Sequence, residues 1–480
     1  MKFVAQSLPI PTLPKNGEGA FAPPPRSGGG REGDDVFSRY SARFFPTFRS
    51  AMVSTKAATT AHFTHRRPRT MINSYLPAWP LHPDGVFWVG AALVLATLTG
   101  ESVFRFLKWP RLVGYAAAGM ILAAGGAGLN VYELQNSARA IVDTALAVLL
   151  FEIGHRVNLR WLRANPALLG MSLLESALGF GAVWITLVFL GFAALQSAIV
   201  AGLLMATSPA VVLRISSEFR TNGQVTERLL LLSALNTFYA LLVCSLLLGM
   251  MDADGPQGAA ASALHLLYLL GGSVLAAALL AWAVNWVERH FDFRDEGGAL
   301  MLVGLIVLTL SLTRMLNWSA LLTPLLAGAL LRWRSPRPRL WPRHFGTAGG
   351  VLMVLLFLIL GLSLNARILL AGGLAAALVI VVRLVAKLAG ALAFGRVSGA
   401  SWRQSVALGL SLNPAAGVSF VLALSFLGSS AGAALHPMLA VAFSAIALLE
   451  LLAPLLTRWA LGYSGDIAPG PVSRTTGGSA

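Results

Sequence analysis

The chain has 480 residues, of which 56% are hydrophobic and only 12% are charged, and its formal net charge is +16 at pH 7. Uncharged runs of about twenty residues recur from residue 84 almost to the end, and each is long enough to cross a hydrocarbon core about 30 Å thick. These runs are continuously apolar rather than alternating, which excludes a transmembrane barrel and predicts an all-α polytopic membrane protein. The single cysteine, Cys244, excludes a disulfide framework and a thiolate metal cluster.

The first seventy residues differ in composition from the rest of the chain. They are rich in proline and glycine, lack an apolar period, and hold eleven Lys or Arg against four acids, a pattern that is typical of disorder. They contain no apolar core of a secretory signal, and a start at Met71 would lead directly into the first span. We therefore expect residues 1–70 to be a disordered leader, with Met71 as an alternative start site.

Thirteen membrane spans are predicted in a transmembrane domain at 84–460, followed by a short cytoplasmic tail at 461–480. The spans cover approximately residues 84–104, 112–127, 140–155, 167–191, 196–213, 229–249, 263–287, 298–313, 317–331, 348–363, 369–394, 404–427 and 434–457. Of the 25 lysines and arginines after residue 70, 20 fall on one side of these spans, which the positive-inside rule assigns to the cytoplasm. The pattern predicts a multi-pass protein of the plasma (inner) membrane with its N-terminus outside and its C-terminus inside. Topology thus explains most of the net charge without a nucleic-acid partner.

Two of the predicted spans are interrupted in the same way. The stretch "LLMATSPAVVLRI" places Pro209 inside span five, and "SLNPAAGVS" places Pro414 inside span twelve. Proline breaks the helical hydrogen-bond ladder, and matching breaks in spans of opposite direction are typical of an inverted repeat, here of spans 1–6 and 8–13. In such folds, freed carbonyls and helix ends can hold an ion near the bilayer midplane. The two prolines therefore predict broken helices 5 and 12 around an ion site.

Four stretches, taken in order, show a family likeness. "GYAAAGMILAAGGAGL", "ALAVLLFEIGHRVNLRWLR" and "FLILGLSLNARIL" resemble a glycine-rich second span, a third span and the end of a tenth span. "RLVAKLAGALAFGRVSGASWRQSVALGLSLNPAAGVSFVLA" resembles a span eleven with a membrane-embedded lysine, followed by a broken span twelve. Together they resemble the cation/proton antiporter superfamily, which includes sodium/hydrogen exchangers and the membrane domain of potassium-efflux antiporters. The resemblance implies a homodimeric secondary transporter that rocks its core helices against a dimerising domain.

The sequence departs from this family in span six. Family members carry an aspartate pair, or asparagine followed by aspartate, and the second residue binds the cation and the proton in turn. In the matching "SALNTFYALL", Asn236 fills the first position and Thr237 stands at the second. A hydroxyl can coordinate a cation, but it cannot exchange the cation for a proton near neutral pH.

Few other ionisable residues fall inside the predicted spans. Three acids near helix ends have a basic residue one turn away and are interpreted as interfacial pairs: Glu101 with Arg105, Asp143 with Arg139, and Glu152 with Arg156. Glu175 and Glu450 each lie about nine residues from a cytoplasmic helix end, roughly 13 Å at 1.5 Å per residue. That depth prevents the carboxylate from reaching the interface easily, so each acid requires a partner or a water-filled cavity.

Span eleven carries two cationic residues one turn apart. Arg383 and Lys387 share one helix face, which costs repulsion unless something compensates for it. Lys387 lies at nearly the same depth as Asn236, so the two side chains can meet across the site. Because lysine can bind and release a proton, we expect Lys387, together with Glu175, to couple protons to transport.

These residues predict a secondary transporter that exchanges a monovalent cation, sodium or potassium, for protons. We expect the cation to be held by side chains of five residues: Thr207, Ser208, Asn236, Thr237 and Asn413. Two alternatives stay open because of Thr237, namely a transport-inactive sensor or scaffold and an ion-coupled transporter of an organic anion. The sequence contains neither an HExxH nor a GxSxG motif, so we expect no enzyme, no cofactor and no metal beyond the transported cation.

Overall fold

A computed structural model describes most of the chain beyond residue 84. The described residues are 85–124, 139–252, 258–291, 296–334, 345–363, 370, 372–428 and 432–467. They all belong to the second of two compact units, Pro83–Ala480. The predicted leader and its alternative start at Met71 lie outside the described residues, as does the tail from residue 468.

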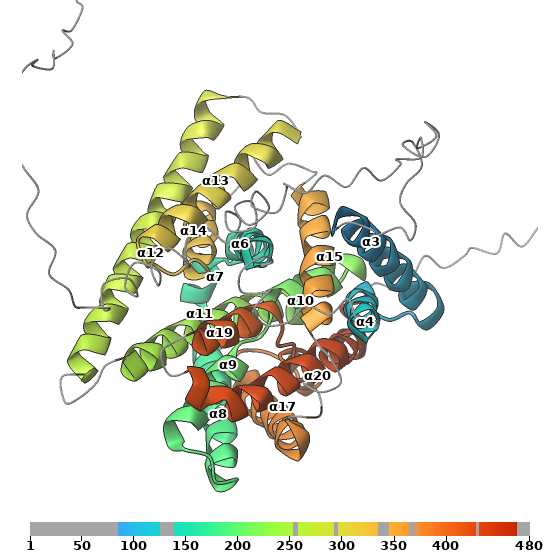
Figure 1. Ribbon diagram of the computed structural model, residues 1–480, viewed down its shortest axis with the longest axis vertical. Coiled ribbons are helices and arrows are strands. Elements are labelled where there is room, and N and C mark those ends of the chain that lie inside the picture. Colours follow the sequence, from blue (N-terminus) through green and yellow to red (C-terminus); the bar gives the residue numbers. More distant parts are fainter. Residues whose placement is uncertain are drawn as a thin grey trace, which may run out of the picture. The chain divides into compact units, whose positions relative to one another are not determined.

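Every regular element within the described residues is a helix, which confirms the all-α class (Figure 1). The helices, in chain order, are α3 (Gly85–Ser102), the π-helical turn η2 (Val103–Leu107), α4 (Arg111–Leu122), α6 (Arg139–Arg156), α7 (Leu159–Ala164), α8 (Pro166–Phe189), α9 (Ala194–Met205), α10 (Pro209–Glu218), α11 (Gln224–Asp252), α12 (Gly258–His290), α13 (Glu296–Met315), α14 (Leu322–Arg334), α15 (Phe345–Ser363), α17 (Gly373–Gly395), α18 (Trp402–Ser411), α19 (Gly417–Leu427) and α20 (Gly432–Ser464).

Eight helical segments of the described chain are long and apolar enough to cross a membrane, and three further apolar helices are shorter. Among the eight, the segment Ala194–Glu218 is the most completely buried. Helix α6 does not qualify, because its 18 residues include two arginines, an aspartate and a glutamate. The predicted total of thirteen spans and the inverted repeat therefore stay predictions.

The two predicted helix interruptions are present. Helix α9 ends at Met205 and α10 begins at Pro209, whose fixed φ angle suits the first position of a helix and whose missing N–H is not needed there. Helix α18 ends at Ser411, and α19 begins only at Gly417. The segments 206–208 and 412–416, called the crossing segments below, thus contain no helix.

The helices pack into two groups. In the crossing group (α8–α11 and α17–α20), α17 packs against α8 and α18, and α18 also packs against α20. In the flanking group (α3, α4, α6 and α12–α15), α6 packs against α14 and α15, and α4 packs against α3 and α15. Contacts such as those of α6 with α10, and of α11 with α12, join the two groups.

Two glycines allow α6 and α14 to approach within backbone contact. A Cβ atom added to Gly154 of α6 would lie 2.1 Å from the carbonyl oxygen of Leu325, and one added to Gly328 of α14 would lie 2.2 Å from that of Phe151. Both obstacles are main-chain atoms, which cannot rotate away as a side chain can. The close pair of helices therefore depends on glycine at both positions.

We expect Gly154→Ala to lower the free energy of unfolding by about 1–3 kcal/mol, because the added methyl group forces the two helices apart. Gly181→Ala on α8 is the matched control, since its Cβ meets nothing within 4 Å. Alanine is the better helix former, so the control should be neutral or stabilising by up to about 1 kcal/mol. The loss of helical circular dichroism on heating the purified protein in detergent reports unfolding. Equal melting temperatures for the two variants would contradict the close contact.

Candidate functional site

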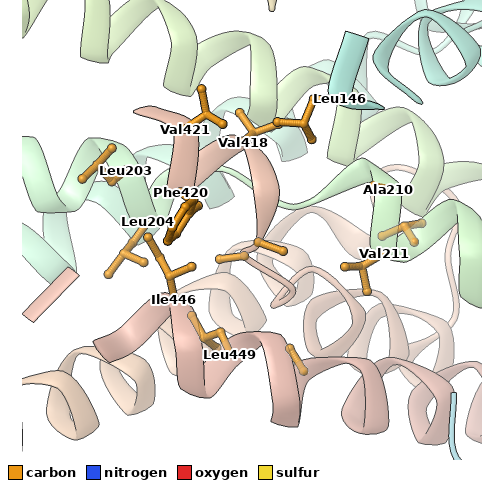
Figure 2. Packing of buried hydrophobic residues seen from close by; sticks show 14 of the residues in the cluster. Leu146, Leu203, Leu204, Ala210, Val211, Val418, Phe420, Val421, Ile446 and Leu449 are labelled. Atoms are coloured by element: carbon orange, nitrogen blue, oxygen red, sulfur yellow. The ribbon is translucent and has the colours of Figure 1, made fainter. Parts of the chain in front are cut away.

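The two crossing segments meet directly. The backbone N–H of Ser208 donates to the carbonyl of Pro414 at 2.7 Å, and the hydroxyl of Thr207 donates to the carbonyl of Leu412 at 2.7 Å. Apolar side chains surround this contact, and Figure 2 shows Leu204, Val418, Phe420 and Ile446 among them. The polar atoms of the crossing segments therefore lie in a low-dielectric environment, where hydrogen bonds and charges act strongly.

Arg383 of α17 donates to three of the carbonyls at the two breaks. Its Nε donates to the carbonyl of Leu204 at 2.6 Å, and its Nη2 donates to that of Ala206 at 2.9 Å. Its Nη1 donates to the carbonyl of Asn413 at 2.6 Å and lies 3.2 Å from the side-chain oxygen of the same residue. The C-terminal ends of α9 and α18 both carry partial negative charge, which the guanidinium compensates. In this conformation Arg383 thus occupies three of the freed carbonyls, and the prediction that these carbonyls face an ion stays a prediction.

Lys387 and Glu175 form a completely buried ion pair. The Lys387 Nζ lies 2.9 Å from the Glu175 Oε2, and both side chains are 0% exposed. The Lys387 Nζ also lies 3.3 Å from the hydroxyl oxygen of Thr207. The pair can form because Gly390 lets α17 approach α8, and a Cβ there would lie 2.5 Å from the Glu175 Cα. Glu175 is thus the compensating group that the sequence required for Lys387.

Asn236 of α11 links this ion pair to the crossing. Its side-chain nitrogen donates to the Glu175 Oε1 and, at 3.0 Å, to the hydroxyl oxygen of Thr207. Its side-chain oxygen accepts from the Ser176 hydroxyl at 2.8 Å. The Thr237 hydroxyl lies 3.1 Å from the carbonyl oxygen of Thr207, within donating distance. Thr207, Asn236, Thr237, Glu175 and Lys387 therefore belong to one hydrogen-bonded network.

The other predicted ion ligands lie at the edge of this network. Asn413 is buried and donates its amide to the carbonyls of Gly409 and Leu410, both at 3.1 Å. Ser208 is buried and caps the start of α10 through its backbone, without a side-chain cap bond. Sequence reasoning missed Ser176, although its position directly after a deeply buried glutamate was a usable signal.

The three pairs predicted at helix ends have a mixed outcome. Glu152 pairs with Arg156 at 3.0 Å, as predicted. Asp143 lies 3.6 Å from Arg139 but also bonds to Arg314 of α13.

The predicted partner of Glu101 is wrong. Glu101 pairs with Arg111 at 2.8 Å rather than with Arg105. Lys108 adopts a left-handed backbone conformation with a φ of 56° directly after η2. The resulting turn brings α4 back beside α3, so that Arg111 reaches the acid from the following helix.

Two cavities lie between the crossing group and the flanking group. The larger, of about 780 Å³, is lined by residues that include Asp143 of α6 and Leu241 of α11. Leu241 lies one helical turn after Thr237, so this cavity ends close to the network. The smaller, of about 340 Å³, is lined in part by Arg111 and Glu218, whose side chains bond at 3.0 Å across the boundary between the groups.

The sequence matches the transmembrane sodium/hydrogen exchanger family over residues 91–462. A solved structure of the sodium proton antiporter MjNhaP1 from Methanocaldococcus jannaschii at pH 8 is similar, with a TM-score of 0.60, 19% identity, and coverage of 80% of this chain and 98% of that chain. A structure from an electron-microscopy map of the same antiporter has a TM-score of 0.64, 16% identity and the same coverage. At these identities the likeness shows the fold alone, whereas the family match covers most of the chain. This multi-pass membrane protein therefore belongs to the sodium/hydrogen exchanger family, a family of transporters.

Proposed function

We propose that the protein is a secondary transporter of the plasma (inner) membrane that exchanges a monovalent cation, sodium or potassium, for protons. The observation that carries this proposal is the buried ion pair between Lys387 and Glu175, 2.9 Å long, which Asn236 and Thr207 join to the crossing segments. Membership of the sodium/hydrogen exchanger family supports the same function.

In this proposal Glu175 supplies the carboxylate that Thr237 lacks. Asn236 donates directly to the Glu175 carboxylate, so an acid from α8 stands beside the position where the family resemblance implies an aspartate on α11. A carboxylate on a neighbouring helix can bind a cation as well as one on α11, provided that it reaches the same space. The substitution at Thr237 therefore does not remove the negative charge from the site.

Lys387 is the proposed proton carrier. In the described conformation its ammonium group neutralises Glu175. An entering cation would take the place of the ammonium beside the carboxylate, and Lys387 would release its proton because two cations cannot share one buried carboxylate. Thr207, Ser208, Asn236, Thr237 and Asn413 would supply neutral oxygen ligands, which suit sodium or potassium as hard cations.

The crossing group is proposed to move against the flanking group, and the latter to dimerise with a second copy. The larger cavity would open to the outside and the smaller to the cytoplasm, with the N-terminus outside and the C-terminus inside. The ion pair between Arg111 and Glu218, 3.0 Å long, spans the two groups beside the smaller cavity. Movement of one group against the other would have to break this contact.

The test uses everted membrane vesicles with a pH-sensitive dye, to which sodium, potassium or lithium is added in pulses. We expect proton flux in response to sodium or potassium. We also expect Thr237→Asp to lower the cation concentration for half-maximal flux by about tenfold, equivalent to about 1.4 kcal/mol, because a charged oxygen binds a cation more strongly than a hydroxyl.

Thr237→Asn is the control for shape without charge, and we expect it to leave the affinity close to that of the wild type. If the wild type shows no cation-dependent flux and Thr237→Asp gains it, the native protein is a transport-inactive sensor or scaffold. If neither protein moves protons, cation/proton exchange is excluded for this chain.

A further inference from the structure

Helix α20 contains a buried acid that the proposed exchange does not use. Glu450 is 2% exposed, and neither of its carboxylate oxygens has a hydrogen-bond partner within the described residues. A bare carboxylate without a partner is very unfavourable in an apolar interior, so a buried acid in that situation takes up a proton instead. We therefore expect Glu450 to be a neutral carboxylic acid in this conformation.

Two contacts define where Glu450 lies along the crossing group. Arg403, at the start of α18, donates to the carbonyl of Tyr463, and Thr457 donates to the carbonyl of Ser411, at the end of α18, at 3.4 Å. Helices α18 and α20 are therefore antiparallel. Glu450 lies seven residues before Thr457 on α20, a distance of about 10 Å along the helix at 1.5 Å per residue. It is therefore level with the crossing segment 412–416 and the beginning of α19.

The neighbouring side chains agree with this placement. Ile446, one turn before Glu450, lies beside Leu204 and Phe420 in Figure 2, and Leu449, directly before Glu450, belongs to the same apolar cluster. The part of α20 that carries Glu450 thus packs into the apolar cluster around the break between the half-helices.

The backbone near Glu450 offers one free carbonyl that can accept a hydrogen bond and one helix start that can stabilise a carboxylate. Pro454 has no N–H, so the helical bond to the Glu450 carbonyl is missing. Helix α19 begins after Ala416, which gives it no side-chain cap. Free amides at a helix start stabilise a carboxylate. Helices α19 and α20 pack together, so a movement that brought Glu450 to the start of α19 would supply its ionised form with the partners that it lacks here.

No charged side chain of the described helices packed against α20 is bonded to Glu450. The basic residues on the neighbouring helices have other partners. Arg383 bonds to Asn413, and Lys387 pairs with Glu175. Arg403 bonds to Tyr463, Arg228 bonds to Ser398, and both Arg111 and Arg214 pair with Glu218. Glu227, near the start of α11, is exposed. On α20 itself, Arg458 lies over the ring of Phe219, two turns away, and His436 is exposed near the beginning of the helix. Within the described chain, the proton on Glu450 is thus independent of any ion pair.

We propose that Glu450 is a second proton-binding site of the crossing group, which holds a proton in this conformation and releases it when the crossing segments move to admit the cation. On release the O–H bond of the carboxylic acid breaks, the carboxylate keeps the electron pair, and the proton passes to water. This inference rests on the proposed exchange. Since Lys387 carries the first proton, a second proton on Glu450 makes the exchange two protons for one cation.

The first test measures coupling in proteoliposomes by finding the pH gradient that just balances an imposed cation gradient. The wild type should move two protons per cation, and Glu450→Gln, which has the same shape but cannot release a proton, should move one. Glu450→Asp should restore the ratio of two. Glu227→Gln, at an exposed acid near the start of α11 in the same crossing group, is the matched control and should keep the ratio of the wild type. An unchanged ratio in Glu450→Gln would overturn the proposal.

The second test does not depend on transport. The infrared spectrum of the purified protein should contain the carbonyl band of a protonated carboxylic acid that is free of hydrogen bonds, and Glu450→Gln should lack it. The band should disappear reversibly in the wild type at alkaline pH. Absence of the band, or a band that persists until the protein denatures, would show that Glu450 exchanges no proton. Failure of cation-dependent flux in the wild type, with a band that titrates, would instead disprove the exchange and leave Glu450 a titrating acid.

Discussion

Lys387→Met should abolish cation-dependent proton flux and also destabilise the protein. Methionine fills a similar volume but cannot carry a proton, so Glu175 loses the protonated partner that it exchanges for the cation, and without cation entry the proton on Glu450 is not moved either. It also leaves Glu175, which is 0% exposed, without its cationic partner. Removing one member of a buried ion pair typically costs about 3–5 kcal/mol, because the remaining charge is uncompensated. Flux in vesicles and thermal unfolding in detergent, followed through the loss of helical circular dichroism, measure the two effects separately.

The double variant Lys387→Met with Glu175→Gln separates coupling from stability. With both charges removed, most of the lost stability should return, since a neutral pair needs no compensation. Proton flux should remain absent, because neither the carrier nor the carboxylate is present. Full flux in the single variant Lys387→Met would show that another group carries the proton.

Arg383→Leu should have the largest effect on folding. The guanidinium donates to the carbonyls of Leu204, Ala206 and Asn413, and each buried acceptor left unsatisfied costs about 1–3 kcal/mol. A total loss of about 3 kcal/mol or more should greatly reduce the yield of folded protein, as measured by size-exclusion chromatography in detergent. Arg383→Lys should recover only part of the yield, because an ammonium group lacks the planar fork that spans three carbonyls.

Arg396→Leu is the control for removal of an arginine from the same helix. Arg396 lies at the end of α17, is exposed, and stacks over Trp402 with 5.3 Å between its guanidinium carbon and the ring centroid. Its loss should change the free energy of unfolding by less than about 1 kcal/mol. If Arg383→Leu behaves like this control, the bonds to the crossing segments contribute little to folding.

Some features of the site could be predicted because their signals are local in the sequence. Pro209 and Pro414 interrupt apolar runs, and both interruptions are present. Lys387 and Glu175 are charged residues deep inside apolar spans, where a charge requires a partner. Their pairing at 2.9 Å follows from that requirement, although the choice of Glu175 rather than another acid depends on how α8 packs against α17.

Other features depend on contacts that no local pattern contains. The bonds of Arg383 join carbonyls near residues 205 and 413, which come together only when both broken helices are in place. The sequence therefore showed Arg383 only as a repelling neighbour of Lys387. The partner of Glu101 depended in the same way on the turn at Lys108, whose left-handed backbone is uncommon for lysine.

The complete burial of Glu175 also bears on leakage. A carboxylate that has lost the Lys387 ammonium and has not yet gained a cation would have to pass through the apolar packing around the crossing as a bare charge, which is strongly unfavourable. We therefore expect the unloaded transporter to stall rather than return empty. Neither the cation nor the proton could then move down its own gradient alone, so every transport cycle would exchange one for the other.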